Sequence, residues 1–565
     1  MQSEFDVIVV GAGPAGSAAA LSLTRRGVSV LMLEKGKVPG EKSMTGGVLY
    51  GDFPGGQGIR SLVPDFDSSA PLERQIISHE VVVLGAPDEE KGTAQFYRMT
   101  KTSLAGKLGL FSASIETGHD FSVLSRPFDS WFADLAVKEG ATLSTSTTAV
   151  GLIKEDGVVA GVMTTHESLR SKVVIDSSGV TSTLVEEAGL RKTLSPRQLY
   201  HGIKRVYGLD PGVIERRFRV GAGKGRAAFY LGGFMQGIGG GAFVYTNKET
   251  LSVGLVVELD SLVRATTEHF DRVGKLIDVQ DEFEGHPMVA ELLDGATLLE
   301  YSAHNTPKSF KSILKKPYAD GYLVAGDALG SFVKMGPMVD GMRGAIASGI
   351  MAAEAFARAN SSGSFRARNL SRYREMLGPI YDDVGRSGRD SFISESSFTY
   401  HTLPRVIFGT RLISETFNFV PRARPSTHQN TIQRVSAGLN LLSFDLDGER
   451  QQIKVDTNLA SMSITKPWVP TCPANCFVLQ TSKGEFASFR DLYEHNLRLL
   501  STGTNPPPSI RRKAFSETKR DVAEGRLRFD HSSCVSCGTC GSIGPAELVE
   551  FAHEEDGHGV RYKFG

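Results

Sequence analysis

The hydrophobic pattern at the start of the chain predicts strands and helices in alternation. The apolar run Asp6–Val10 has the length of a buried strand, and Pro14–Arg26 repeats apolar positions with helical spacing. A second apolar run, Val28–Leu33, predicts another strand, and glycines separate the first strand from the helix. This order of strand, glycine turn, helix and strand is typical of a parallel α/β sheet.

The pattern changes several times further along the chain. A second α/β stretch runs from Phe128 to about Gly179 and ends in the predicted strand Lys172–Ile175. Residues from about 195 to 300 are rich in strands such as Leu251–Val257, with a glycine turn at Gly237–Gly241. Tyr322–Ala325 fits one more buried strand.

The remaining third of the chain begins helical and then changes character. Ser348–Ala357 predicts a helix, and residues 361–460 are mostly helical and amphipathic. Pro467, Pro470 and Pro473 mark the change into a segment that contains all the cysteines of the chain.

The first glycine turn matches the dinucleotide-binding fingerprint GxGxxG. Gly11 makes the tight turn, Gly13 lets the backbone approach a pyrophosphate, and Gly16 lets the helix pack on the strand. Glu34 ends the next strand 18 residues after Gly16, where it would accept hydrogen bonds from ribose hydroxyls. The alternative is a glycine-rich turn that binds nothing.

Two later motifs favour FAD over NAD as the dinucleotide. Gly321–Gly330 is a buried strand that runs into Gly326-Asp327, similar to the motif in FAD oxidoreductases whose Asp holds the ribityl chain. Asp176–Gly179 (DSSG) is similar to the strand-end motif of the same class, and Arg126 matches an arginine that approaches the cofactor phosphates. Either short motif alone would be a chance match, and Arg126 alone would suit the start of a surface helix.

The cysteines predict an iron–sulfur cluster. Cys534, Cys537 and Cys540 form an overlapping CxxCxxC run, as in bacterial ferredoxins, but Gly544 stands where the fourth cysteine is expected. Cys472, followed by proline, is the predicted fourth ligand, so we expect one [4Fe–4S] cluster. Zinc is the rival, since four thiolates also make a closed zinc site. Cys476 is then a buried small residue or a replacement for Cys472 as ligand.

Charge and hydropathy exclude several other classes. Lys and Arg total 63, and Asp and Glu also total 63, so no net field favours nucleic acid. Acidic residues stand where the basic start of a signal peptide is expected, and no apolar run is long enough to span a bilayer. We therefore expect a cytoplasmic protein.

Together these motifs resemble the electron-transfer-flavoprotein:quinone oxidoreductase family, with a FixC-like flavoprotein fused to a FixX-like ferredoxin. The FixC-like part covers about residues 1–360 and includes Pro39–Tyr50, Pro71–Arg74 and Phe243–Lys248. The FixX-like part comprises Cys472-Pro-Ala, Cys534–Cys540 and Gly559–Gly565. The likeness is weak across residues 361–460.

The resemblance implies a donor, an acceptor and a location. Reduced electron-transfer flavoprotein (α and β subunits) would supply electrons and membrane quinone would receive them, with the protein attached peripherally to the inner face of the cell membrane. Leu104–Phe111 and Leu403–Val420 are the candidate membrane contacts, although either segment would also suit an ordinary core. The helix that begins near Gly341 would direct its N-terminus at the flavin ring.

We expect no direct catalytic side chains, because the redox centres carry the chemistry. The predicted cluster ligands are Cys472, Cys534, Cys537 and Cys540. The predicted FAD-binding residues are Gly11, Gly13, Pro14, Ala15, Gly16, Glu34, Lys35, Thr45, Gly46, Gly47, Arg126, Val150, Ser178, Gly179, Gly326, Asp327, Gly341 and Met342.

The predicted fold class is α/β. It has a Rossmann-type FAD-binding domain like those of glutathione reductase and the hydroxylases (residues 1–180 and 301–360), an inserted β-rich quinone or substrate domain (181–300), a helical region (361–460) and a ferredoxin-like [4Fe–4S] domain (461–565). The rival functions are a geranylgeranyl-reductase-like or hydroxylase-like FAD enzyme and a non-catalytic relay subunit. Gly237–Gly241 runs into an apparent strand instead of a helix, so we expect no second dinucleotide site for NAD(P)H.

Overall fold

A computed structural model describes most of the chain. It covers residues 5–45, 47–53, 56–99, 119–335, 338–394, 415–421, 430–446, 453–501, 503, 505–545, 547–555 and 557–565. The candidate membrane segment Leu104–Phe111 lies outside these ranges, as does the part of Leu403–Val420 that precedes residue 415.

The first sheet has the strand order of a dinucleotide-binding fold. Its strands run in the order β16 (Tyr318–Ala319), β17 (Tyr322–Val324), β10 (Ser168–Asp176), β1 (Phe5–Val10), β2 (Val30–Leu33) and β7 (Thr142–Ser144). From β17 to β7 the strands are parallel. Numbered along the chain, β7, β2, β1, β10 and β17 have the Rossmann order 3-2-1-4-5, which confirms the predicted α/β start. An antiparallel hairpin, β8 (Ala149–Glu155) and β9 (Val158–Thr164), extends from β10.

Helices cover this sheet. Helix α1 (Pro14–Thr24) packs against α13 (Met342–Ser361) and α5 (Ser125–Lys138), and its small side chains Ala18, Ala19 and Ala20 are fully buried. Gly349 of α13 has no room for a side chain, because a Cβ would come within 2.1 Å of the Ala15 carbonyl oxygen. Small residues therefore let two helices that are far apart in sequence meet at the start of the fingerprint helix.

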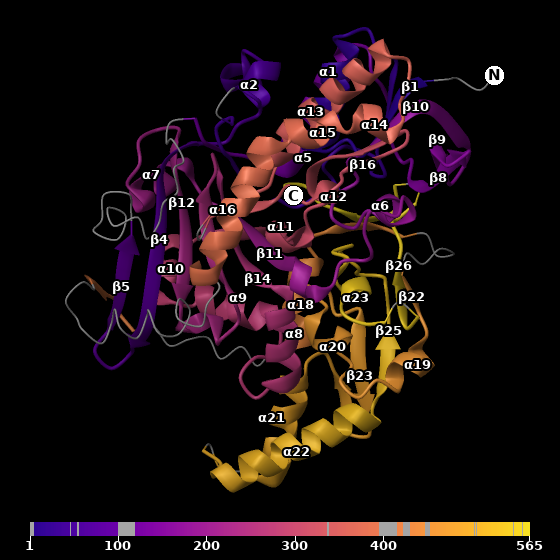
Figure 1. Cartoon of the computed structure of the whole chain (residues 1–565). Helices are drawn as coiled ribbons and strands as arrows, with labels where there is room; N and C mark the ends of the chain where they lie inside the picture. Colours follow the sequence, from indigo (N-terminus) through magenta and orange to yellow (C-terminus); the bar gives the residue numbers. More distant parts are fainter. Residues whose placement is uncertain are drawn as a thin grey trace.

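The second sheet is mainly antiparallel and draws strands from distant parts of the chain. Its order is β15 (Thr297–Pro307), β11 (Leu199–Gly208), β14 (Thr250–Glu258), β13 (Gly240–Thr246), β12 (Lys224–Gly232), β4 (Gln75–Asp88), β5 (Thr93–Met99) and β20 (Glu415–Asn418), with β3 (Val48–Leu49) and β6 (Phe121–Ser122) joining at β4. Strands β4 and β5 fall inside the predicted range 1–180 yet belong to this sheet, at the left of Figure 1. Gly237–Gly241 does run into strand β13, as predicted.

The described part of the region 361–460 is mainly helical, as its sequence pattern predicts, and also contains three short strands. It contains helices α14 (Ala367–Leu370), α15 (Arg372–Met376), α16 (Gly378–Ser394) and α18 (Thr431–Leu439). It also contains the strands β20, β21 (Ser443–Asp445) and β22 (Ile453–Val455). Each of these strands pairs with a partner distant in sequence, for example β22 with β26 (Val549–Phe551), which a local pattern does not reveal.

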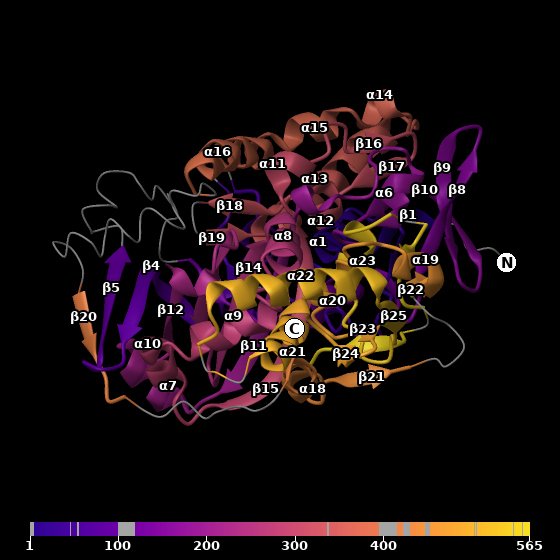
Figure 2. The same ribbon diagram turned by 90° about the horizontal axis from the view of Figure 1, so that it is seen from below.

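Residues 453–565 form a module of short strands and helices, which we call the cysteine module. It contains α19 (Thr457–Ser461), α20 (Trp468–Thr471), β23 (Phe477–Thr481), β24 (Gly484–Phe486), α21 (Phe489–Leu500), α22 (Pro508–Glu524), β25 (Arg526–Phe529), α23 (Thr539–Ser542), β26 and β27 (Gly559–Arg561). Strand β23 pairs with β24 and β25, while β27 pairs with β21. Figure 2, seen from below, shows α22 crossing the middle of the molecule.

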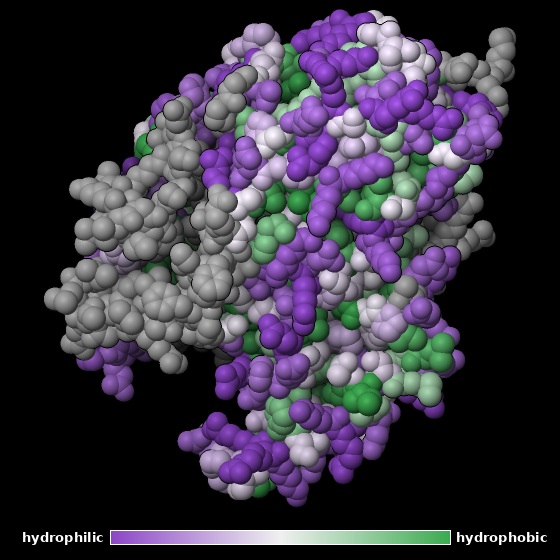
Figure 3. All heavy atoms as spheres, in the orientation of Figure 1, coloured by the Kyte–Doolittle hydropathy of each residue, from purple (hydrophilic) through white to green (hydrophobic). Residues whose placement is uncertain are grey.

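Most large hydrophobic side chains are buried, and a few are exposed on the cysteine module. Leu459, Met462 and Ile464 expose 49%, 77% and 75% of their surface. Figure 3 shows hydrophobic atoms over the part of the surface where Figure 1 labels α19. Among the described residues, no helix has the length and apolar character needed to cross a bilayer.

Candidate dinucleotide and cysteine sites

The fingerprint turn adopts the geometry that the sequence predicts. Gly11 has φ +93°, a region that favours glycine. A Cβ on Gly16 would lie 1.9 Å from the Gly11 carbonyl oxygen, whereas a Cβ on Gly13 would meet no atom within 4 Å. Gly13 precedes the first residue of α1 and has no side-chain cap, and it lines a large cavity. A pyrophosphate can therefore approach the helix N-terminus directly at Gly13.

Glu34 is held in place at the end of β2. One of its carboxylate oxygens accepts a hydrogen bond from the Ala12 N–H at 3.1 Å, and the other accepts one from the Gly36 N–H at 2.7 Å. Burial raises the pKa of Glu34, while the two backbone hydrogen bonds oppose that rise. Glu34 lines the same cavity as Gly13, at a position suited to ribose hydroxyls.

The two later motifs meet at the same cavity. Asp176, at the end of β10, accepts hydrogen bonds from the hydroxyls of Ser178, Ser182 and Tyr322, each at 2.6 Å. These bonds fix the turn that brings Ser178 and Gly179 to the cavity wall. Asp327 follows β17 and lines the cavity, where burial raises its pKa to about 7 although Arg191 lowers it.

The structure places the predicted FAD residues unequally around this cavity. The lining includes Gly11, Gly13, Pro14, Ala15, Glu34, Lys35, Thr45, Gly47, Ser178, Gly179, Gly326, Asp327, Gly341 and Met342. Gly16 lies behind Gly11 as the packing contact expected of it. Helix α13 begins at Met342, so its N-terminus does face the cavity. Gly46 lies outside the described residues.

Arg126 and Val150 do not line the cavity in this structure. Arg126 donates from Nη1 to the carbonyl oxygen of Tyr562 at 3.4 Å. Val150 is 48% exposed, and its neighbour Ala149 lines the cavity instead. The fold thus orients Arg126 toward the end of the cysteine module, a contact that its local sequence does not predict.

Sequence reasoning missed several lining residues. Lys42, Asp129, Thr148, His304 and His553 all reach the cavity. Burial raises the pKa of Asp129 well above its ordinary value and lowers the pKa of both His304 and His553 to about 4. Two of these residues lie near sequence signals: Lys42 is inside the segment Pro39–Tyr50, and Asp129 follows Arg126 by three positions.

The observed lining fits FAD in particular. Glu34, Lys35 and Ala149 line the cavity, as does Gly13, where an added side chain would meet no atom within 4 Å. Phe243, Tyr245 and Leu255 supply an apolar wall from the second sheet, and Gly341 brings the start of α13 to the same space. Polar groups that suit an adenosine, a turn that suits a pyrophosphate and an apolar wall that suits a flavin ring therefore belong to one cavity.

The cysteines line a second, smaller pocket. Cys472, Cys476, Cys534, Cys537 and Cys540 all contribute to its wall, which is otherwise mostly apolar. Backbone N–H groups point at two of the sulfurs, from Cys476 to Cys472 Sγ at 3.3 Å and from Ser536 to Cys534 Sγ at 3.4 Å. Hydrogen bonds to sulfur of this kind are typical of iron–sulfur sites.

The thiols of this pocket differ in the direction of their pKa shifts. A hydrogen bond from Cys476, together with Lys275, lowers the pKa of Cys472 to about 6 against the effect of burial. Burial raises the pKa of Cys537 to about 12, and that of Cys540 well above its ordinary value. Of these three thiols, only Cys472 has a pKa that favours the thiolate near neutral pH, whereas burial keeps Cys537 and Cys540 protonated. Within the described ranges, no three His, Cys, Asp or Glu residues converge as a ligand set for a metal ion.

Cys476 occupies a position that the sequence leaves open. It is only 2% exposed, as expected of a buried small residue, but its thiol also interacts with those of Cys472 and Cys534. The choice between Cys472 and Cys476 as fourth ligand therefore stays a prediction.

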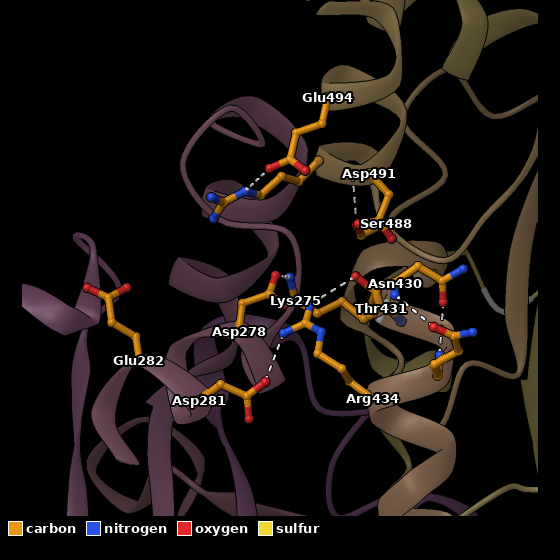
Figure 4. Close-up of polar contacts among 12 residues, drawn as sticks. Lys275, Asp278, Asp281, Glu282, Asn430, Thr431, Arg434, Ser488, Asp491 and Glu494 are labelled. Carbon is orange, nitrogen blue, oxygen red and sulfur yellow. Dashed lines mark hydrogen bonds and ion pairs between the residues drawn. The ribbon is translucent and has the colours of Figure 1, made fainter. Parts of the chain in front are cut away.

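Lys275 and helix α9 (Leu276–Glu284) contact both the cysteine module and helix α18. Lys275, which immediately precedes α9, donates from Nζ to the carbonyl oxygens of Val469 and Cys472 at 2.8 and 2.7 Å. Arg434 of α18 forms ion pairs with Asp278 and Asp281 of α9, as Figure 4 shows. The carbonyl of one predicted ligand is thus fixed by a lysine from another domain.

Strands β11 and β15 separate the two sites. Gly202 and His304 face the dinucleotide cavity. Their neighbours His201 and Asn305 lie on the opposite face of the same strands, because successive side chains of a strand alternate. His201 Nδ1 pairs with Asn305 Oδ1 at 2.8 Å, and both contact the Thr539 hydroxyl, at 3.1 and 3.0 Å. Thr539 lines the cysteine pocket, so the two sites are one layer of sheet apart.

The fold and the dinucleotide cavity define an FAD-dependent oxidoreductase. The family model for FAD-dependent oxidoreductases matches residues 6–195. FixC of Escherichia coli K12 is 36% identical over 380 residues, which cover 67% of this chain and 83% of FixC. The probable electron transfer flavoprotein-quinone oxidoreductase YdiS of the same organism is 33% identical over 406 residues, covering 72% of this chain and 89% of YdiS.

This level of identity and coverage confirms the predicted family. The chain belongs to the family of FixC and the electron-transfer-flavoprotein:quinone oxidoreductase-like proteins. A geranylgeranyl bacteriochlorophyll reductase-like structure from Thermoplasma acidophilum shares the fold, with a TM-score of 0.54, 22% identity and coverage of 77% of this chain and 96% of that one. The alignment with FixC covers about two thirds of the chain.

Proposed function

We propose that this protein is an electron-transfer-flavoprotein:quinone oxidoreductase, which takes electrons from reduced electron-transfer flavoprotein and delivers them to membrane quinone. The observation that carries the proposal is the single layer of sheet, β11 and β15, between an FAD-type cavity and a pocket lined by five cysteines. An FAD enzyme that acts on a small substrate needs no second redox centre there. A protein that passes electrons onward does.

The proposed cofactors are FAD and one [4Fe–4S] cluster. Gly13 and the start of α1 would hold the pyrophosphate, Glu34 the adenosine ribose, and Asp327 the ribityl chain. Cys534, Cys537 and Cys540, with Cys472 or Cys476, would hold the cluster. Bound flavin can exchange one or two electrons and a cluster exchanges one, which together suit a quinone that takes two electrons and two protons.

The residues of the chain give both centres a dry and fixed environment. Tyr245 and Phe243 stack on each other at 4.8 Å and close the cavity from the second sheet. Trp468 is 1% exposed, lines the cysteine pocket and donates from Nε1 to the Cys540 carbonyl oxygen at 3.2 Å. Excluding water in this way protects reduced centres from side reactions.

Contact with the inner face of the membrane is part of the proposal, because quinone dissolves in lipid. The support is the sequence of Leu403–Val420, of which the structure describes only the end. There, β20 pairs with β5 and forms the edge of the second sheet, and Val420 is 82% exposed.

An anaerobic titration tests the function. Reduced electron-transfer flavoprotein should bleach the flavin absorbance rapidly, and a soluble quinone analogue should restore it. NADH and NADPH alone should act very slowly, because β13 follows the second glycine run where a nucleotide-binding helix would be required. Rapid stoichiometric bleaching by NADH alone would instead place the protein among the hydroxylases or reductases.

A further inference from the structure

The last residues of the cysteine module lie against the dinucleotide cavity. His553 lines the cavity, and its Nε2 pairs with the Thr181 carbonyl oxygen at 3.1 Å. Its Nδ1 is buried without a partner among the described residues. The cavity that the first 350 residues build thus has part of its wall supplied by a residue about 200 positions further on.

Glu554 joins the cavity wall to the cysteine run. Its side chain is buried, and one carboxylate oxygen pairs with Lys35 at 3.4 Å, next to Glu34. The other carboxylate oxygen accepts a hydrogen bond from the Ser536 hydroxyl, between Cys534 and Cys537. The Glu554 carbonyl oxygen accepts from the hydroxyl of Thr148, a lining residue, at 2.7 Å. One residue therefore contacts both sites.

Lys42 fixes the segment that follows. It lines the cavity, is buried, and donates from Nζ to the carbonyl oxygens of Gly557, His558 and Val560 at 3.2, 2.7 and 2.8 Å. An ammonium group has three N–H donors, and Lys42 directs all of them to one segment of the cysteine module. This contact therefore holds the segment specifically against the dinucleotide domain.

The final residues are anchored in the same way. The Glu300 carboxylate accepts backbone N–H bonds from Lys563, Phe564 and Gly565 at 2.5, 2.9 and 2.9 Å. Tyr562 donates its N–H to the Glu41 carbonyl oxygen at 2.9 Å and its hydroxyl to the Val535 carbonyl oxygen at 3.2 Å. Figure 1 marks this end of the chain in the middle of the view, and a Cβ on Gly565 would come within 2.8 Å of the Ser125 side chain at the start of α5.

We propose that the end of the cysteine module from His553 onward supports one wall of the FAD site, so that the module must be docked for FAD to be held tightly. His553 is then an FAD-site residue supplied by the module, and Glu554 is a positioning residue that holds the lining residues Lys35 and Thr148. The coupling is reciprocal, because a ligand that binds the docked state more tightly also stabilises docking by the same free energy. The inference rests on FAD occupying the cavity, and it does not depend on the donor or acceptor of the electrons.

Hydrogen exchange on the full-length protein tests the coupling without a mutation. FAD is stripped and restored, and backbone amide exchange is followed in peptides that cover 553–565. We expect exchange in these peptides to slow at least about tenfold when FAD binds, as for an equilibrium shifted by about 1.4 kcal/mol. Exchange in α22, which lies at the outer end of the module in Figure 1, is the internal control and should change little.

The variant Glu554→Gln tests the contact itself. It removes the charge but keeps the shape, and we expect the Kd for FAD to rise about tenfold. Iron and sulfide content is measured in the same sample to show that the module has formed. The matched control is Glu550→Gln on β26, whose partner Lys454 is exposed, and its Kd for FAD should stay within about twofold.

Two results would overturn the inference. One is exchange in 553–565 that is unaffected by FAD. The other is wild-type FAD affinity in Glu554→Gln with full iron content. If that variant fails to fold, the exchange measurement on the wild-type protein still shows whether FAD binding and docking of the module are coupled. Neither assay uses electron-transfer flavoprotein or quinone. The results of both assays can therefore be interpreted even if the proposed function is wrong.

Discussion

Replacing Asp327 by Asn should stabilise the FAD-free protein and weaken FAD binding. Asp327 carries a carboxylate into the cavity, and burial raises its pKa from 3.8 to about 7, with Arg191 opposing the rise. In the folded protein the carboxyl therefore keeps a proton that the unfolded chain has already lost. Stability then falls as pH rises from about 4 to about 7. Asparagine does not ionise, so its burial adds no such dependence of stability on pH.

The magnitude follows from the pKa. A move from 3.8 to about 7 corresponds to about 4 kcal/mol of destabilisation above pH 7, of which about 2.5 kcal/mol is lost between pH 5 and pH 8. These figures are upper bounds, because Asp327 lines a cavity that water reaches in the absence of FAD. The free energy of unfolding of Asp327→Asn, relative to that of the wild type, should therefore increase by about 1–2.5 kcal/mol from pH 5 to pH 8.

Urea unfolding of both FAD-stripped proteins at pH 5 and pH 8 measures this difference. Comparing the two proteins at each pH cancels the titration of every other group. FAD affinity of the variant should fall about tenfold, since asparagine cannot offer a charged acceptor to ribityl hydroxyls. An equal stability difference at both pH values would refute the reasoning, because the buried charge would then cost nothing.

Five further changes have expected outcomes. Gly13→Val should purify without yellow flavin, because its side chain fills the open space beside the start of α1, and full flavin content would contradict the fingerprint assignment. Cys537→Ala should lose iron and visible cluster absorbance while still binding added FAD. Cys476→Ala should keep the cluster. Loss of the cluster in this variant would show that Cys476, and not Cys472, is the fourth ligand. Lys275→Met should lower the free energy of unfolding by about 2–3 kcal/mol in urea, since two carbonyl oxygens lose their donor. Burial holds the pKa of His201 at about 4, so stability should be lost as pH falls from about 6.5 to 4, and His201→Gln should flatten that profile.

Local spacing was enough to predict the parts of the protein whose chemistry lies in consecutive residues. Gly11–Gly16, Glu34, Gly326-Asp327 and Gly341 line or support one cavity as expected, because a turn between a strand and a helix is formed by its own residues. The family followed from the same motifs. The CxxCxxC run likewise lies on one pocket with Cys472.

Tertiary structure decided everything that depends on contacts between distant segments. Strands β4 and β5 could not be assigned to the second sheet, because their pairing with β12 and β20 joins residues more than a hundred positions apart. Arg126 pairs with Tyr562 instead of lining the cavity, and His553 reaches a site built around Gly11. The spacing of apolar residues in a sequence predicts whether a segment is a helix or a strand and which of its faces is buried. The packing of the whole chain decides which buried faces contact one another, and here it places the cysteine module against the FAD cavity.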